Sequence, residues 1–110
     1  MKEQDYQRKV VKKLEERGAY VVKVVAASKK GVPDVIACVP MTKAQVMRLF
    51  EGQAHVGIFI GAEIKTPLTR NDASKLQEHN LKAIAEAGGI SGIVVDYDDM
   101  KNHLGNYDEA

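Results

Sequence analysis

Apolar residues recur along the chain with two periods, one typical of helices and one typical of strands. Where they fall three or four positions apart among charged residues, the pattern predicts amphipathic helices. The predicted helices cover residues 3–17, 43–50 and 72–87, and a short helical turn covers residues 98–104. Runs rich in β-branched residues predict strands. The predicted strands cover residues 19–26, 33–39, 56–66 and 90–96.

Capping residues support several of these boundaries. Gly18 and Gly88 follow the two long helices, where a glycine commonly ends a helix. Thr42, with Gln45 three residues later, matches a capping box at the start of the short helix. The order helix, strand, strand, short helix, strand, helix, strand predicts an α/β sandwich around a small mixed sheet flanked by helices. Its last strand–helix–strand unit predicts a right-handed parallel crossover.

Length and composition bound the class of protein. The chain has 110 residues, of which 45% are hydrophobic and 28% charged, so we expect one globular domain over residues 1–110. The single cysteine, Cys38, excludes an intrachain disulfide and a multi-cysteine zinc site, and we expect it to pack as a small apolar side chain. No apolar run approaches the roughly 20 residues of a membrane span. We therefore expect a cytoplasmic protein with no membrane partner.

Charge is distributed unevenly along the chain. The net charge of +1 excludes a globally basic nucleic-acid binder. However, residues 1–30 hold nine Lys/Arg and four Asp/Glu, whereas residues 96–110 hold one and five. The basic third fits a polyanionic partner. A solvated helix face followed by an exposed acidic tail explains the same charges, and charge alone favours that interpretation.

Two acidic positions in neighbouring predicted strands carry the candidate chemistry. Asp34 follows Pro33 at the start of the second strand, and Glu63 precedes Ile64 and Lys65 near the end of the third. Because alternate strand residues share a face, Glu63 and Lys65 should project together while Ile64 points into the core. If the second and third strands pair, Asp34 approaches Glu63. Two carboxylates that close repel, so one is protonated or a cation lies between them.

Oxygen ligands suit a hard cation such as Mg²⁺. Asp34, Glu63 and the main-chain carbonyl of Ile64 would supply them, and such an ion polarises a phosphodiester oxygen and activates water. Lys65 would then place a positive charge near the attacking water. Gln77, early in the second long helix, is positioned to hydrogen-bond a phosphate or to hold Lys65. No organic cofactor is implied.

Further polar residues flank this constellation. Glu3, at the head of the first helix, would reach the metal directly or through a water, with Gln7 one turn further on the same face. A plain first-turn acid that favours the helix dipole explains Glu3 nearly as well. Residues around the turn before Asp34 would contact phosphates or stay solvated. They are Lys23, Ser28, Lys29 and Lys30.

The ordered set of Glu3, residues 31–34, residues 63–65 and Gln77 resembles the PD-(D/E)XK nuclease superfamily, and most closely its VRR-NUC branch. The resemblance spans nearly the whole chain. It implies a Mg²⁺-dependent DNA endonuclease, in which Mn²⁺ can substitute. In that reading Asp34 and Glu63 bind the metal, Lys65 assists the attacking water, and Glu3 and Gln77 complete the site.

The branch also implies partners. Its small stand-alone members are similar to phage and archaeal Holliday-junction resolvases, which act as homodimers on branched DNA. The resemblance therefore implies branched DNA and a second copy of the chain as partners, and fits a phage-encoded protein acting in the host cytoplasm.

Some features depart from the family pattern or leave alternatives open. Residues 40–53 separate the two motif strands more widely than a tight hairpin would. Three interpretations of this segment are open: a dimer element, a substrate loop or an insertion. The large apolar residues in this stretch are expected in the core, with a dimer seam as the alternative. They are Met41, Met47, Leu49 and Phe50.

Three histidines lack metal-ligand spacing, and we expect them at the surface. They are His55, His79 and His103. Two other functions remain open for the chain. One is a catalytically inactive nuclease-fold module that binds nucleic acid or a replication or repair protein, and the other is a structural α/β protein whose motif is coincidental.

Overall fold

The structure is a computed structural model that describes residues 2–105. The chain divides into two compact units, Met1–Glu51 and Gly52–Ala110. Each unit has its own two-stranded sheet. The acidic residues Asp108 and Glu109 of the expected exposed tail lie outside the described range.

The first unit contains two helices and one antiparallel strand pair. Its elements are α1 (Glu3–Glu16), β1 (Tyr20–Lys23), β2 (Val35–Cys38) and α2 (Lys43–Leu49). β1 pairs with β2 so that Tyr20 lies opposite Cys38. The two strands are shorter than predicted, although a hydrogen bond of 2.8 Å from Val24 N to Asp34 O continues the pairing just beyond them.

Helix α1 ends where the sequence predicts. Gly18 adopts a positive φ of 92°, which costs glycine no steric strain, and its N–H donates to Glu15 O at 2.9 Å. The turn directs the chain into β1, against which α1 packs. Leu14 and Val11 are half-buried on this side of the helix. Cys38, at the end of β2, is 7% exposed, which confirms its expected packing as a small apolar side chain.

Helix α2 begins with the predicted capping box. Gln45 N donates to Thr42 Oγ1 at 3.1 Å, and Thr42 N donates to Gln45 Oε1 at 2.9 Å. The expectation of a core around this helix is wrong for three of its four residues, since Met41, Met47 and Leu49 are 41%, 75% and 58% exposed. The main packing of this unit joins α1 to β1 and β1 to β2, which leaves α2 outside it.

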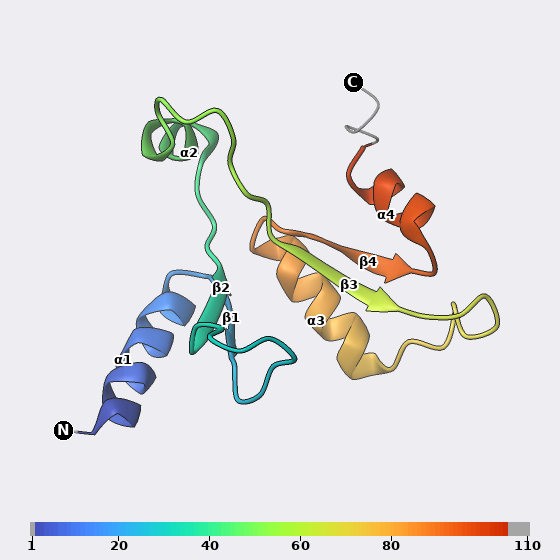
Figure 1. Cartoon of the computed structure of the whole chain (residues 1–110), viewed down its shortest axis with the longest axis horizontal. Helices are drawn as coiled ribbons and strands as arrows, with labels where there is room; N and C mark the ends of the chain where they lie inside the picture. Colours follow the sequence, from blue (N-terminus) through green and yellow to red (C-terminus); the bar gives the residue numbers. More distant parts are fainter. Residues whose placement is uncertain (1, 106–110) are drawn as a thin grey trace. The chain divides into compact units, whose positions relative to one another are not determined.

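The second unit is a strand–helix–strand crossover followed by a short helix. Its elements are β3 (Ile60–Ile64), α3 (Lys75–Glu86), β4 (Ile90–Val94) and α4 (Tyr97–His103). β3 and β4 pair in parallel, which confirms the parallel crossover, and Figure 1 shows them side by side with α3 along them. α3 begins three residues later than predicted because Ser74 is its N-cap, with its hydroxyl accepting from Gln77 N at 3.1 Å.

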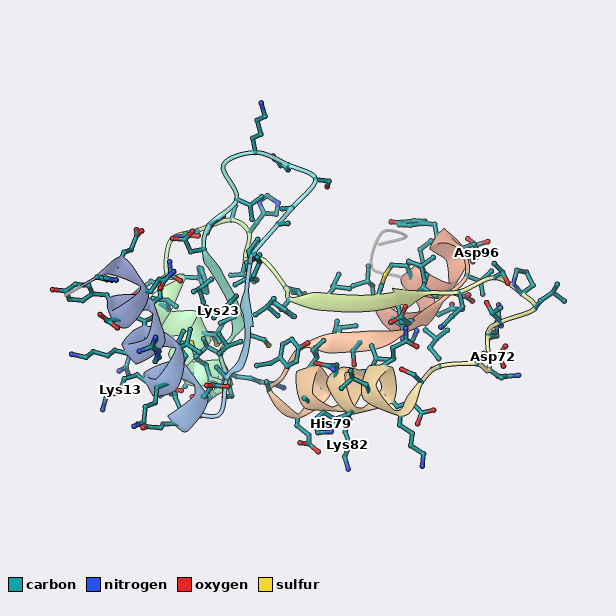
Figure 2. All side chains as sticks on the ribbon, turned by 90° about the horizontal axis from the view of Figure 1, so that it is seen from below. Lys13, Lys23, Asp72, His79, Lys82 and Asp96 are labelled. Atoms are coloured by element: carbon teal, nitrogen blue, oxygen red, sulfur yellow. The ribbon has the colours of Figure 1, made fainter. Side chains whose placement is uncertain are left out.

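Close packing fixes α3 on the sheet. A Cβ atom on Gly61 of β3 would collide with the end of the Ile84 side chain of α3, so the two elements approach closely here and a larger residue would force Ile84 to shift. Ser91 Oγ of β4 donates to Leu81 O of α3 at 2.6 Å. Ile84 is 5% exposed and forms the centre of this small core. Figure 2 shows the exposed histidine of α3, His79, extending away from the sheet, as expected for a surface residue.

The fold belongs to the α/β class, as predicted, but its strands form two sheets. Among the described residues, β1 pairs with β2 and β3 pairs with β4, in place of the expected single mixed sheet. The long stretch between β2 and β3, which contains α2, gives these two strands no hairpin to pair them. No helix within residues 2–105 has the length and apolar character that a membrane span requires.

Candidate active site

The end of β3 presents Glu63 and Lys65 on one face, as the alternation of strand residues predicts. Gly61, two residues before Glu63, faces Ile84 of α3, so Glu63 and Lys65 also lie on the α3 side. Both side chains are half-buried. In the part of the chain that the structure describes, the Glu63 carboxylate forms no hydrogen bond or ion pair, and it is therefore available as an oxygen ligand.

Ile64 corrects one expectation. Its side chain points away from α3, but it is 66% exposed and does not enter a core. On that side of the sheet α4 packs on β4, where a Cβ on Gly92 would collide with the His103 ring. The cover provided by α4 therefore reaches β4 and leaves Ile64 of β3 open.

Gln77 holds the Lys65 side chain, one of the two roles expected for it. Lys65 Nζ donates to Gln77 Oε1 at 3.2 Å in a half-buried position. The same Oε1 accepts from Ser74 N at 2.9 Å, which completes the capping box of α3. One amide oxygen thus fixes both the start of the helix and the position of the ammonium group.

The loop between Lys65 and α3 is itself anchored. Thr66 N donates to Thr69 Oγ1 at 2.9 Å, and Arg70 forms an ion pair of 3.3 Å with Asp99 of α4. The Asp99 carboxylate also accepts from Val95 N at 2.9 Å, so it joins the loop to the end of β4. Arg70 and Asp99 also line a pocket of about 280 Å³. They hold the segment that positions Gln77 relative to Lys65.

In the first unit, Asp34 lies directly before β2 with its carboxylate exposed. Its backbone is fixed by the hydrogen bond from Val24 N, and its Oδ2 accepts from Gln7 Nε2 of α1 at 3.3 Å. The sequence placed Gln7 only on the same helix face as Glu3. The sequence signal for this contact is that Gln7 is a polar residue next to the apolar face of α1. That face packs against β1.

Glu3 occupies the first turn of α1 and is exposed. Within residues 2–105 its carboxylate forms no hydrogen bond or ion pair. That position suits a first-turn acid that interacts with the helix dipole, and a metal-ligand role for Glu3 stays a prediction. The predicted phosphate-contact residues are exposed around the turn before Asp34. They are Lys23, Ser28, Lys29 and Lys30.

The predicted site residues thus fall into two groups. The first unit holds Asp34 with Gln7, and the second holds Glu63, Lys65 and Gln77. The meeting of Asp34 with Glu63 stays a prediction. Over the described range, no group of three or more His, Cys, Asp or Glu side chains gathers as a metal cluster. The donors offered are carboxylate oxygens, and these fit a hard cation such as Mg²⁺.

Comparison with known proteins leaves the family assignment open. No protein-family model matches the chain, and no significant match was found among curated proteins or among solved structures. The resemblance to VRR-NUC nucleases therefore rests on the motif residues themselves.

Proposed function

We propose that the chain is a Mg²⁺-dependent endonuclease that hydrolyses phosphodiester bonds of branched DNA, acting as a homodimer. The observation that carries the proposal is the hydrogen bond from Lys65 to Gln77, on the same face as Glu63. A surface lysine with no function gains little from such a tether, because holding its long side chain costs about 2 kcal/mol of rotamer entropy. A lysine that must stand beside a reacting phosphate benefits from it.

Each residue has a distinct task in this reaction. Lys65 supplies a fixed positive charge as the phosphate gains negative charge during attack by water. Gln77 is a positioning residue, since it acts by holding Lys65. Gln7 orients the Asp34 carboxylate through its 3.3 Å hydrogen bond and leaves the second carboxylate oxygen free.

The metal would bind the carboxylates of Asp34 and Glu63 and the main-chain carbonyl of Ile64, with Glu3 joining directly or through a water. When bound, the ion polarises a phosphodiester oxygen and makes a bound water a stronger nucleophile. Glu63 is a half-buried residue, and it supports this assignment because its carboxylate lacks a hydrogen-bonding partner in the described range and a cation would neutralise it.

Cleavage of a labelled four-way junction tests the proposal. The wild type should cut with Mg²⁺ or Mn²⁺ and not with EDTA. Glu63→Gln should abolish cutting, and Lys65→Ala should lower the rate by at least about 100-fold, as expected when one charge-stabilising donor is lost. Lys82→Ala is the matched control, because Lys82 extends from α3 away from the sheet (Figure 2); it should cut like the wild type.

Two results would contradict the proposal. A wild type that binds the junction but never cuts it would instead be an inactive nucleic-acid-binding module. A Glu63→Gln variant that still cuts would remove Glu63 from the site. Flaps, forks and plain duplex in the same panel define the preferred substrate, and gel filtration tests the homodimer.

A further inference from the structure

The outward side of α1 carries cations on successive turns. Arg8, Lys9 and Lys12 lie at the helical spacing that places residues on one side, and together with Asp5 they line an open depression of about 350 Å³. The other side of the helix packs against β1. The depression therefore faces away from the strands of its own unit.

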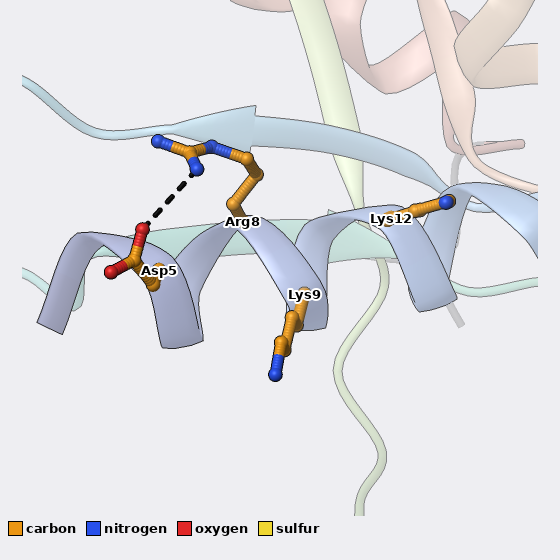
Figure 3. Close-up of a pocket in the computed structure, with 4 residues that line it drawn as sticks. All are labelled: Asp5, Arg8, Lys9 and Lys12. Atoms are coloured by element: carbon orange, nitrogen blue, oxygen red, sulfur yellow. Dashed lines mark hydrogen bonds and ion pairs between the residues drawn. The ribbon is translucent and has the colours of Figure 1, made fainter. Parts of the chain in front are cut away.

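Two of these cations are unneutralised. Arg8 Nη1 forms an ion pair of 3.3 Å with Asp5, and Lys13, which directly follows Lys12, lies 3.8 Å from Glu16. Lys9 and Lys12 have no ion-pair partner among the described residues. Figure 3 shows both extending away from the Asp5–Arg8 pair. The depression thus has an excess of positive charge, which an anion would balance.

These lysines lie on the side of α1 opposite its contact with the candidate site. Gln7, which contacts Asp34 at 3.3 Å, lies on the side that packs against the strands, whereas Lys9 and Lys12 lie two and five residues later on the other side of the helix. From Lys9 to Lys12 the helix rises about 4.5 Å, since each residue adds about 1.5 Å. Successive phosphates of a DNA strand advance about 3.4 Å along the duplex axis. Two ammonium groups on this segment therefore match neighbouring phosphates of one strand.

We propose that Lys9 and Lys12 of α1 bind backbone phosphates of the DNA substrate on the side of the helix that faces away from Asp34. This inference rests on the proposed function. The proposed contact surface on α1 is separate from Lys29 and Lys30 in the turn before Asp34. The contacts are electrostatic and independent of base sequence, because ammonium groups on a helix face read charge and not base edges.

The salt dependence of binding tests the proposal. Anisotropy of a labelled four-way junction is measured in EDTA, so that binding is separated from cutting. Each lost phosphate contact makes the negative slope of log K against log salt about 0.9 less steep, so Lys9→Ala with Lys12→Ala should make it about 1.8 less steep. Between about 50 and 200 mM salt, the affinity of the double variant should then fall about 12-fold less than that of the wild type.

Two further variants complete the design. Lys9→Arg with Lys12→Arg keeps both charges and should restore the wild-type slope. Lys43→Ala with Lys82→Ala removes the same number of charges from α2 and α3, and should leave the slope unchanged. Helix content from circular dichroism checks the fold of every variant, since alanine keeps helix propensity high.

The outcomes separate this proposal from the proposed function. If the wild type binds and cuts but the Lys9→Ala, Lys12→Ala variant keeps its full slope, the α1 surface is overturned and the nuclease stands. An equal loss of slope in the Lys43→Ala, Lys82→Ala control would show a general charge effect and would also overturn it. If the wild type neither binds nor cuts DNA, the proposed function fails first, and this inference fails with it.

Discussion

Replacing Gln77 with alanine removes one oxygen that serves two donors. Its Oε1 accepts from Ser74 N at 2.9 Å and from Lys65 Nζ at 3.2 Å. Loss of the capping contact costs about 1 kcal/mol. The bond to the charged Lys65 contributes about 1 kcal/mol, below the usual range for charged groups, because it is only half-buried. We expect Gln77→Ala to lower the free energy of unfolding by about 2 kcal/mol.

A double-mutant cycle isolates the contact between Gln77 and Lys65. Lys65→Met keeps an apolar stem of similar length and removes the donor. Urea unfolding of the wild type, both single variants and the double variant should give a coupling energy of about 1 kcal/mol. Gln77→Glu retains an acceptor oxygen for both donors and should keep the stability of the wild type.

The comparison with Ser74→Ala makes the test specific. This variant removes the other half of the capping box, so it should lower stability by about 1 kcal/mol without coupling to Lys65. It should also leave DNA cutting intact, whereas Gln77→Ala should slow it. A coupling energy below about 0.5 kcal/mol between Lys65 and Gln77 is within ordinary additivity and would refute the tether.

Three other predictions concern the folds of the two units. Gly61→Ala should lower the unfolding free energy by about 1–3 kcal/mol in urea titrations, because its Cβ would collide with Ile84, and adding Ile84→Val should recover part of the loss; no recovery would place the strain elsewhere. Buried Cys38 should react with a thiol reagent much more slowly in the folded protein than in urea, and equal rates would contradict its burial. Burial raises the pKa of the Cys38 thiol above its ordinary 9.0. The stability that the buried thiol contributes should therefore be complete below about pH 9 and decline as the pH rises through the pKa of the folded protein. A Cys38→Ala variant should lack this decline.

Local signals in the sequence predicted the elements well. The capping pair Thr42 and Gln45 starts α2, and Gly18 ends α1, because both features act through backbone groups a few residues away. The same kind of signal was present in Ser74 and Gln77 and would have placed the start of α3 correctly. Strand ends were less certain, since β-branched runs continue past the last ladder hydrogen bond.

Sheet formation and burial depend on contacts distant in sequence, and there the sequence was a weaker guide. Alternation in β3 correctly grouped Glu63 with Lys65, but it could not say which side of the strand would be covered, so the burial expected of Ile64 was wrong. The burial expected of Met47 was wrong for a similar reason, because an apolar residue on a short helix is buried only if another element packs against it. Of the site, the spacing offered the contact of Gln77 with Lys65 as one of two roles, whereas the contact of Gln7 with Asp34 required the structure.

The central proposal is that Asp34 and Glu63 share one divalent ion. Mn²⁺ titrated into ¹⁵N-labelled protein tests it most directly, because the ion broadens the amide signals of residues close to it. We predict that the signals of residues 34–36 and 63–65 broaden together at substoichiometric Mn²⁺, and that Glu63→Gln removes the broadening at both places. Broadening of one group alone, or broadening near Asp34 that survives Glu63→Gln, would contradict the shared site.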